Sequence, residues 1–247
     1  MTPFKNSLLQ NFIRKYSLDG LIDNGIIEIK DGVMTTCFRP EREFWDAVDI
    51  RGLIELRNTG LPDAILADMS PATLIKNLSV LDENITIEYK YFLDHYYSLT
   101  IRDENKKKLT YRLCEPMHCY AGRKKLNCAF DFKKNLDKLF IKEILKTIRA
   151  TNTKYIAFFV ENDKMLMGYN YMQCTELKCE LDECLHKGFH NAIYLEVNYF
   201  QAIIKNNINF DNAYMQLNSS KWFEFVFEEN DFTSTYWILG GQIEWGR

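Results

Sequence analysis

The sequence predicts an α+β protein built from two tandem modules, each with helices on one face of antiparallel sheets. The 247-residue chain is 47% hydrophobic and 26% charged, which is typical of folded rather than disordered proteins. Its length is enough for two domains of ordinary size. An internal repeat and a matching order of expected elements indicate that the two domains are copies of one fold.

The repeat has an offset of 128 residues. Residues 4–14 align with residues 132–142, and Phe, Lys, Leu, Phe and Ile recur in register. Residues 63–70 align with residues 191–198 at the same offset. Two well-separated windows that share one offset favour a duplication over chance recurrence of short apolar–basic words. The predicted parts are an N-terminal domain over 1–114, a connector over 115–127 and a C-terminal domain over 128–247.

Periodicity and capping residues predict the elements of the first half. Residues 4–16 carry apolar side chains at helical spacing, with Thr2 as N-cap and Pro3 at the first helical position. Ser70 and Pro71 begin a second helix in the same way. The predicted strands of this half cover residues 26–30, 33–38, 44–56, 64–69, 85–94, 96–102 and 108–114.

The second half repeats this order. A helix is predicted over residues 134–150 and a shorter one over about 198–207. The predicted strands of this half cover residues 154–161, 164–171, 175–183, 191–197, 212–218, 222–228 and 233–239.

The helix over 134–150 carries a stripe of positive charge. At about 100° per residue, four cations fall within an arc of roughly 80°; they are Lys138, Lys142, Lys146 and Arg149. The apolar residues are expected on the other side: Leu139, Phe140, Ile141, Ile144 and Ile148. A solvated face is the ordinary explanation, but surface helices usually mix signs. A single-sign stripe in a chain of net charge −3 suits a polyanion bound through its phosphates.

The other helices carry fewer cations. Arg14 occupies the place of Lys142 in the repeat, whereas Gln10 stands where Lys138 does. Taken together, the residues predicted to contact nucleic acid are Lys138, Lys142, Lys146, Arg149, Lys76, Lys205, Arg14 and Lys5.

Residues for chemistry are hard to find in this sequence. Zinc ligands are available by residue type at Cys174, Cys179, Cys184, His186 and His190. Their spacing contains no Cys-x-x-Cys pair, which argues against a zinc site. No nucleophile elbow or phosphate-binding glycine loop is present. We therefore expect no enzymatic activity, no metal and no cofactor. The sequence contains no run of about 18 apolar residues and no apolar core of a secretory signal peptide. We therefore expect a cytoplasmic protein with free thiols and no membrane partner.

The duplicated pattern with lysine-bearing helices resembles a DNA sliding clamp, the polymerase processivity ring, and is most similar to the clamp of T-even bacteriophages. The segments that carry this resemblance are residues 9–12, 24–27, 74–81, 154–157 and 164–170. The resemblance implies a homotrimeric ring that encircles duplex DNA without reading its sequence and tethers the replicative polymerase. It also implies a clamp loader as partner, late-transcription factors as further candidates and, for a viral protein, the host cytoplasm as its location.

The resemblance further implies that subunits meet by edge-strand pairing, residues 108–114 of one against 175–183 of the next. In the latter strand we expect Leu177, Cys179 and Leu181 to point inward. Partner tails would dock near the connector. Alternatives are an oligomeric virion structural protein of twin β-rich domains, a monomeric processivity subunit of the same fold, and an unrecognised enzyme.

Overall fold

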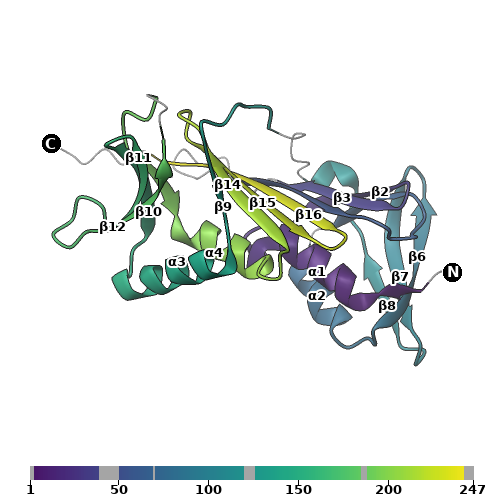
Figure 1. The fold of residues 1–247 in the computed structure, drawn as a ribbon. Coiled ribbons are helices and arrows are strands. Elements are labelled where there is room, and N and C mark those ends of the chain that lie inside the picture. The colour runs from purple at the N-terminus through teal and green to yellow at the C-terminus, as the bar shows by residue number, and fades with distance from the viewer. Residues whose placement is uncertain (1–2, 39–49, 69, 120–125, 185–187, 242–247) are drawn as a thin grey trace. The chain divides into compact units, whose positions relative to one another are not determined.

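A computed structural model describes residues 3–38, 50–68, 70–119, 126–184 and 188–241 (Figure 1). The chain divides into two compact units. The first comprises Met1–Arg42, Arg51–Lys125 and Glu229–Ser234, and the second Glu43–Ile50, Leu126–Glu228 and Thr235–Arg247. The predicted connector stays a prediction, because residues 120–125 lie outside the described residues.

The first repeat contains two helices, α1 (Asn6–Ser17) and α2 (Pro71–Leu78), and two single 3₁₀ turns, Leu18–Gly20 and Pro116–His118. Its strands are β1 (Phe4–Lys5), β2 (Gly25–Lys30), β3 (Val33–Phe38), β4 (Ile50–Leu56), β5 (Ala64–Asp68), β6 (Asn84–Phe92), β7 (His95–Asp103) and β8 (Lys108–Arg112). They lie in two antiparallel arrays of order β1-β6-β7-β8 and β5-β2-β3-β4.

The second repeat has the same order of elements, with helices α3 (Lys138–Thr151) and α4 (Val197–Asn206). Its strands are β9 (Phe132–Asn135), β10 (Tyr155–Glu161), β11 (Lys164–Tyr169), β12 (Leu177–Glu183), β13 (Ile193–Glu196), β14 (Asn212–Leu217), β15 (Trp222–Glu229) and β16 (Phe232–Leu239). Their orders, β9-β14-β15-β16 and β13-β10-β11-β12, match the first repeat strand for strand. The predicted α+β fold of two like halves is confirmed.

The first helix of each repeat begins later than predicted, for one reason. Phe4 and Lys5 form β1, pairing with Ile85 and Asn84 of β6, so α1 starts at Asn6 and Pro3 lies outside it. Thr2, the predicted cap, lies outside the described residues. In the second repeat, residues 134–135 belong to β9 and pair with β14. Pairing with a strand far along the chain therefore overrides helical periodicity at these positions.

Other boundaries follow the local signals more closely. Helix α2 begins at Pro71 after Ser70, as predicted, although the Ser70 hydroxyl donates to the side chain of Thr73 rather than capping a backbone N–H. Of the strand predicted over 44–56, only β4 is described, since residues 44–49 lie outside the described residues. No helix in the described part of the chain is both long and apolar enough to span a bilayer.

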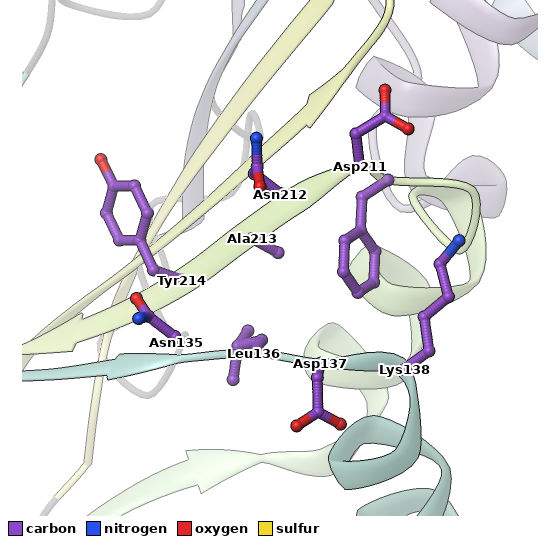
Figure 2. Close-up of a pocket in the computed structure, with 9 residues that line it drawn as sticks. Asn135, Leu136, Asp137, Lys138, Asp211, Asn212, Ala213 and Tyr214 are labelled. Carbon is purple, nitrogen blue, oxygen red and sulfur yellow. The ribbon is translucent and has the colours of Figure 1, made fainter.

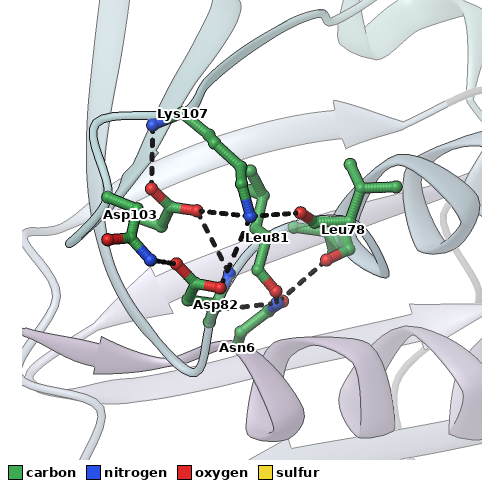
Figure 3. A network of polar contacts seen from close by, with 8 residues as sticks. Asn6, Leu78, Leu81, Asp82, Asp103 and Lys107 are labelled. Carbon is green, nitrogen blue, oxygen red and sulfur yellow. Dashed lines mark hydrogen bonds and ion pairs between the residues drawn. The ribbon is translucent and has the colours of Figure 1, made fainter.

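A polar network ties α1 to the end of α2 (Figure 3). The side-chain amide of Asn6 donates to the carbonyls of Leu78, Leu81 and Asp82 at 2.9, 3.1 and 3.2 Å. Around it, the Asp103 carboxylate accepts from the backbone N–H groups of Asp82 and Lys107. The last carbonyls of a helix have no hydrogen-bond donor within that helix. The Asn6 amide, at the start of α1, donates hydrogen bonds to the last carbonyl of α2 and to two carbonyls that follow it.

Candidate nucleic-acid interface

Helix α3 is the central element of the candidate interface. The Asp137 carboxylate caps its start by accepting from the backbone N–H of Phe140 at 2.7 Å. Ile141, Ile144 and Ile148 form its buried face. These three residues recur at a spacing of three and four, so they hold one side of the helix against the second unit's core.

The four predicted cations of α3 are all exposed. Lys142 and Lys146 follow Lys138 at intervals of four, and Arg149 falls between them in angle at about 100° per residue. Within the part of the chain that the structure describes, no ion pair holds Lys142, Lys146 or Arg149. The helix has a single carboxylate residue, Glu143, which lies outside the arc of cations. The predicted stripe is therefore present as a solvent-facing row.

Leu139 was expected on the apolar face of α3, and this expectation is wrong. Its side chain is 75% exposed, and Phe140 is only half-buried. The buried stripe is narrower than predicted because it is centred on Ile141, Ile144 and Ile148, and Leu139 lies on nearly the opposite side at about 100° per residue. Leu139 thus borders the cation stripe rather than the core.

A hollow of about 640 Å³ lies beside the start of α3 (Figure 2). Lys138 stands at its rim, and its ammonium lies 5.5 Å from the centre of the Phe210 ring, a cation–π distance. The other lining residues are Asn135, Leu136, Asp137, Asp211, Asn212, Ala213 and Tyr214. Because the ring already attracts its charge, Lys138 is held in place more firmly than the other cations of the stripe.

The remaining predicted cations are scattered. Lys5 precedes α1 at its N-cap position, and the Arg14 guanidinium donates to the Gln10 side chain at 3.1 Å; both are exposed. Lys76 and Lys205 are exposed in the last turns of α2 and α4. A cation there is also favoured by the helix dipole, so these two positions have a structural explanation of their own.

Lys154 is a cation that sequence reasoning missed. It lies with Arg149 in a hollow of about 520 Å³ between the end of α3 and the start of α4, where Asn198 and Gln201 also line the wall. The exposed N–H groups of a helix start attract anions. Lys154 lies two residues after Asn152, the C-cap of α3, so its place near this helix end was predictable, but only the fold brings it next to α4.

Strands β8 and β12 each end their array, with a described neighbour on one side alone. In β12 Leu181 is buried and Cys179 half-buried, as expected, but Leu177 is 49% exposed. The expectation for Leu177 is wrong because a terminal strand has fewer neighbours to cover its side chains. Both strands that the resemblance assigned to subunit contacts are thus free on one edge among the described residues.

The cysteines stand apart from the charge stripe. Cys114 and Cys119 lie with their sulfur atoms 3.2 Å apart, and burial raises the pKa of both thiols. Cys174 is exposed and Cys184 buried, while His186 lies outside the described residues. Within the described ranges, no three His, Cys, Asp or Glu side chains gather as a metal site.

Comparisons with known proteins bear on the fold. No protein-family model and no curated protein sequence matches the chain. Solved structures do match over nearly the whole length. The proliferating cell nuclear antigen (PCNA) of A. fulgidus, solved with the C-terminal region of FEN-1 bound, gives a TM-score of 0.74 at 10% identity over 98% of both chains.

Two further PCNA structures agree. The protein from Entamoeba histolytica gives a TM-score of 0.70 at 14% identity over 97% of both chains. The protein from Thermococcus kodakaraensis gives 0.71 at 11% identity over 96% of this chain and 97% of the other. At such low identities the likeness concerns the backbone alone, and it shows that the chain has the two-domain fold of the PCNA sliding clamps.

Proposed function

We propose that the chain is a subunit of a DNA sliding clamp, a homotrimeric ring that encircles duplex DNA and tethers a replicative polymerase without chemistry of its own. The observation that carries the proposal is the cation stripe of α3 within a duplicated clamp fold. The three lysines, four residues apart along the helix, offer point charges at a regular spacing, and only Arg149 carries a fork of donors. Such a surface contacts phosphates and is blind to sequence.

The electrostatics of the whole chain fit a ring better than a monomer. A monomeric processivity subunit would have to hold DNA by attraction alone, yet the net charge is −3. A closed ring needs only enough positive charge on its DNA-facing helices to offset phosphate repulsion. The acidic remainder would discourage DNA from binding elsewhere.

Edge-strand pairing supports the proposed assembly. Strands β8 and β12 each have one free edge in the described structure, and a free edge offers a row of backbone donors and acceptors to another chain. We propose that β8 of one subunit pairs with β12 of the next. The charged residues that alternate along β12, among them Lys178 and Glu180, would then select the register.

Partners follow from the same proposal. A. fulgidus PCNA binds the C-terminal region of FEN-1, and we propose that this chain likewise receives the tails of a polymerase and of a clamp loader near residues 115–127. The similarity to the clamp of T-even bacteriophages and a role with late-transcription factors stay predictions from the sequence.

The test is topological retention. The protein is loaded on nicked circular DNA, with its loader if one is needed, and the complex is isolated by gel filtration before and after the DNA is cut once. A clamp stays on the circle and leaves the linear form. Retention that is equal on both forms would contradict encirclement, and a mass in light scattering other than three chains would contradict the trimer. No retention at all would favour the virion structural protein.

The role of α3 is tested by charge reversal. The variant Lys142→Glu, Lys146→Glu should lose retention at moderate salt, and the slope of log affinity against log salt should fall by about 1.8, since each lost phosphate contact removes about 0.9. A matched control, Lys30→Glu with Lys106→Glu, changes the net charge equally at exposed lysines away from the helices. Equal loss in both variants would show that only net charge matters.

A further inference from the structure

The first unit has an unpaired strand edge that the proposed function does not use. Strand β6 is nine residues long, but its pairing with β1 covers only Asn84 and Ile85. On its other side β6 pairs with β7 along its length. Among the described residues, β6 therefore has one free edge from Thr86 onward.

The backbone groups that point toward this free edge can be identified. The Glu83 carbonyl accepts from the backbone N–H of Asn6 at 2.7 Å, so Glu83 faces the β1 side. In an antiparallel ladder, every second residue directs both its N–H and its C=O to the same neighbour. Ile87 and Tyr89 consequently face the β1 side too, beyond the end of β1 in the described structure. Their four backbone groups lack a partner in the described ladder.

A hollow of about 710 Å³ lies along this edge. Four consecutive residues of β6 line it, Ile87 to Lys90. Successive side chains of a strand point to opposite faces, so a hollow that touches all four lies beside the strand rather than on one face of it. The opposite wall is the segment over residues 60–63, and Tyr96 of β7 closes one end.

Two further features lie at this hollow. The Tyr89 hydroxyl is buried and has no hydrogen-bond partner among the described residues, although buried polar groups are normally paired. Beyond the hollow, the strand leads into an apolar tip formed by Tyr91, Phe92 and Leu93, which are 59%, 62% and 71% exposed. Edge strands are usually blunted by charge or proline, and here the charged residues of β6 are Glu88 and Lys90, both in the lining of the hollow.

We propose that this slot binds an extended peptide segment of a partner protein, which adds to β6 as a further strand. Its backbone would pair with Ile87 and Tyr89, and an apolar side chain would enter between β6 and residues 60–63. A polar atom of the same segment would meet the Tyr89 hydroxyl. Strand addition takes its affinity from the backbone and its specificity from the pockets for alternate side chains. The site is distinct from the α3 stripe and does not depend on the clamp proposal.

The first measurement is amide hydrogen exchange by NMR on the full chain. In the free protein, the amides of Ile87 and Tyr89 should exchange fast, while those of Glu88 and Lys90, which bond to β7, should be protected. Protection of all four in the free protein would mean that the edge is already covered, and the proposal would fail.

The probe is a linear dodecapeptide selected by display against the full chain and then synthesised. Binding should slow exchange at Ile87 and Tyr89 specifically, and N-methylation of alternate peptide amides should remove it. Tyr89→Phe should weaken binding about 2- to 12-fold, the range for one net hydrogen bond. Tyr97→Phe, on the same hairpin but outside the slot, is the matched control.

Three outcomes would overturn the proposal. Selected peptides that leave exchange at Ile87 and Tyr89 unchanged bind elsewhere. An equal effect of Tyr89→Phe and Tyr97→Phe would exclude the slot hydroxyl. Protection that rises with protein concentration alone, with a doubling of the scattering mass, would identify a second copy of the chain as the occupant.

Discussion

Replacing Asn6 by alanine should destabilise the first unit, because this side chain links two helices through three carbonyls. Asn6 is 2% exposed, and its amide donates to the carbonyls of Leu78, Leu81 and Asp82. One amide has two hydrogens, so the three contacts amount to two full hydrogen bonds with one shared. At about 0.5–1.5 kcal/mol for each net bond, Asn6→Ala should cost about 2 kcal/mol.

Asn6→Asp should cost more than Asn6→Ala. A carboxylate of similar size would place acceptor oxygens against three carbonyl oxygens and would bury a charge without a partner. We expect a loss of about 3–5 kcal/mol, the range for an uncompensated buried charge. The order wild type, Asn6→Ala, Asn6→Asp is the signature of a donor role rather than of simple packing.

Urea unfolding followed by circular dichroism gives the free energies, and hydrogen exchange of peptides from α1 and α2 shows where stability is lost. The matched control is Asn84→Ala in the same unit, because Asn84 is exposed and its side chain bonds, within the described part of the chain, only to Glu104 at 2.8 Å. Its effect should stay within about 0.5 kcal/mol. An Asn6→Ala protein as stable as the control would refute the assigned role.

Three further predictions concern other parts of the chain. In Gly52→Ala the new Cβ would lie 2.2 Å from the Phe38 ring, so unfolding free energy should fall by about 1–3 kcal/mol, and Phe38→Leu should restore part of it in a double-mutant cycle. Burial and the neighbouring thiol raise the pKa of Cys119 to about 12, so iodoacetamide at pH 8 should label the exposed Cys174 first, and mass spectrometry after short exposure checks this. Burial alone would raise the pKa of the Asp103 carboxyl, but hydrogen bonds from backbone N–H groups and the charge of the Lys107 ammonium lower it by more, so the net pKa is lowered. The stability that the Asp103 carboxylate contributes should therefore be lost as the pH falls through this lowered pKa. Acid unfolding of the Asp103→Asn variant should lack that loss.

Much of the fold was predictable because its signals are local. Asp31 and Gly32, both with positive φ, make the turn between β2 and β3 that such a dipeptide predicts. Pro71 begins α2 because its missing N–H is not needed there. The duplication could be predicted from the sequence because corresponding segments of the two halves keep their apolar residues in register.

The errors arose where distant residues decide the outcome. Residues 4–5 have helical periodicity, but a partner strand some 80 positions away makes them β1. The exposed Leu139 and Leu177 are apolar residues at positions that no neighbour covers. For the candidate site, the row of lysines on α3 was predictable from spacing alone. Its relation to Lys154 was not, because the start of α4 comes to it only through the fold.

The duplication preserved topology without preserving charge, and this difference yields a last prediction. Helix α1 corresponds to α3, yet Lys15 is 1% exposed and Arg14 is tied to Gln10, so α1 offers little mobile charge to solvent. The side chain of Lys142, by contrast, has neither a hydrogen-bond partner nor an ion-pair partner among the described residues. If both helices face DNA, Lys142→Glu should lower the salt slope by about 0.9, and Arg14→Glu by less, in the same retention assay. Equal slopes in the two variants would mean that the hydrogen bond to Gln10 does not restrain Arg14, and the stripe on α3 would lose its special role.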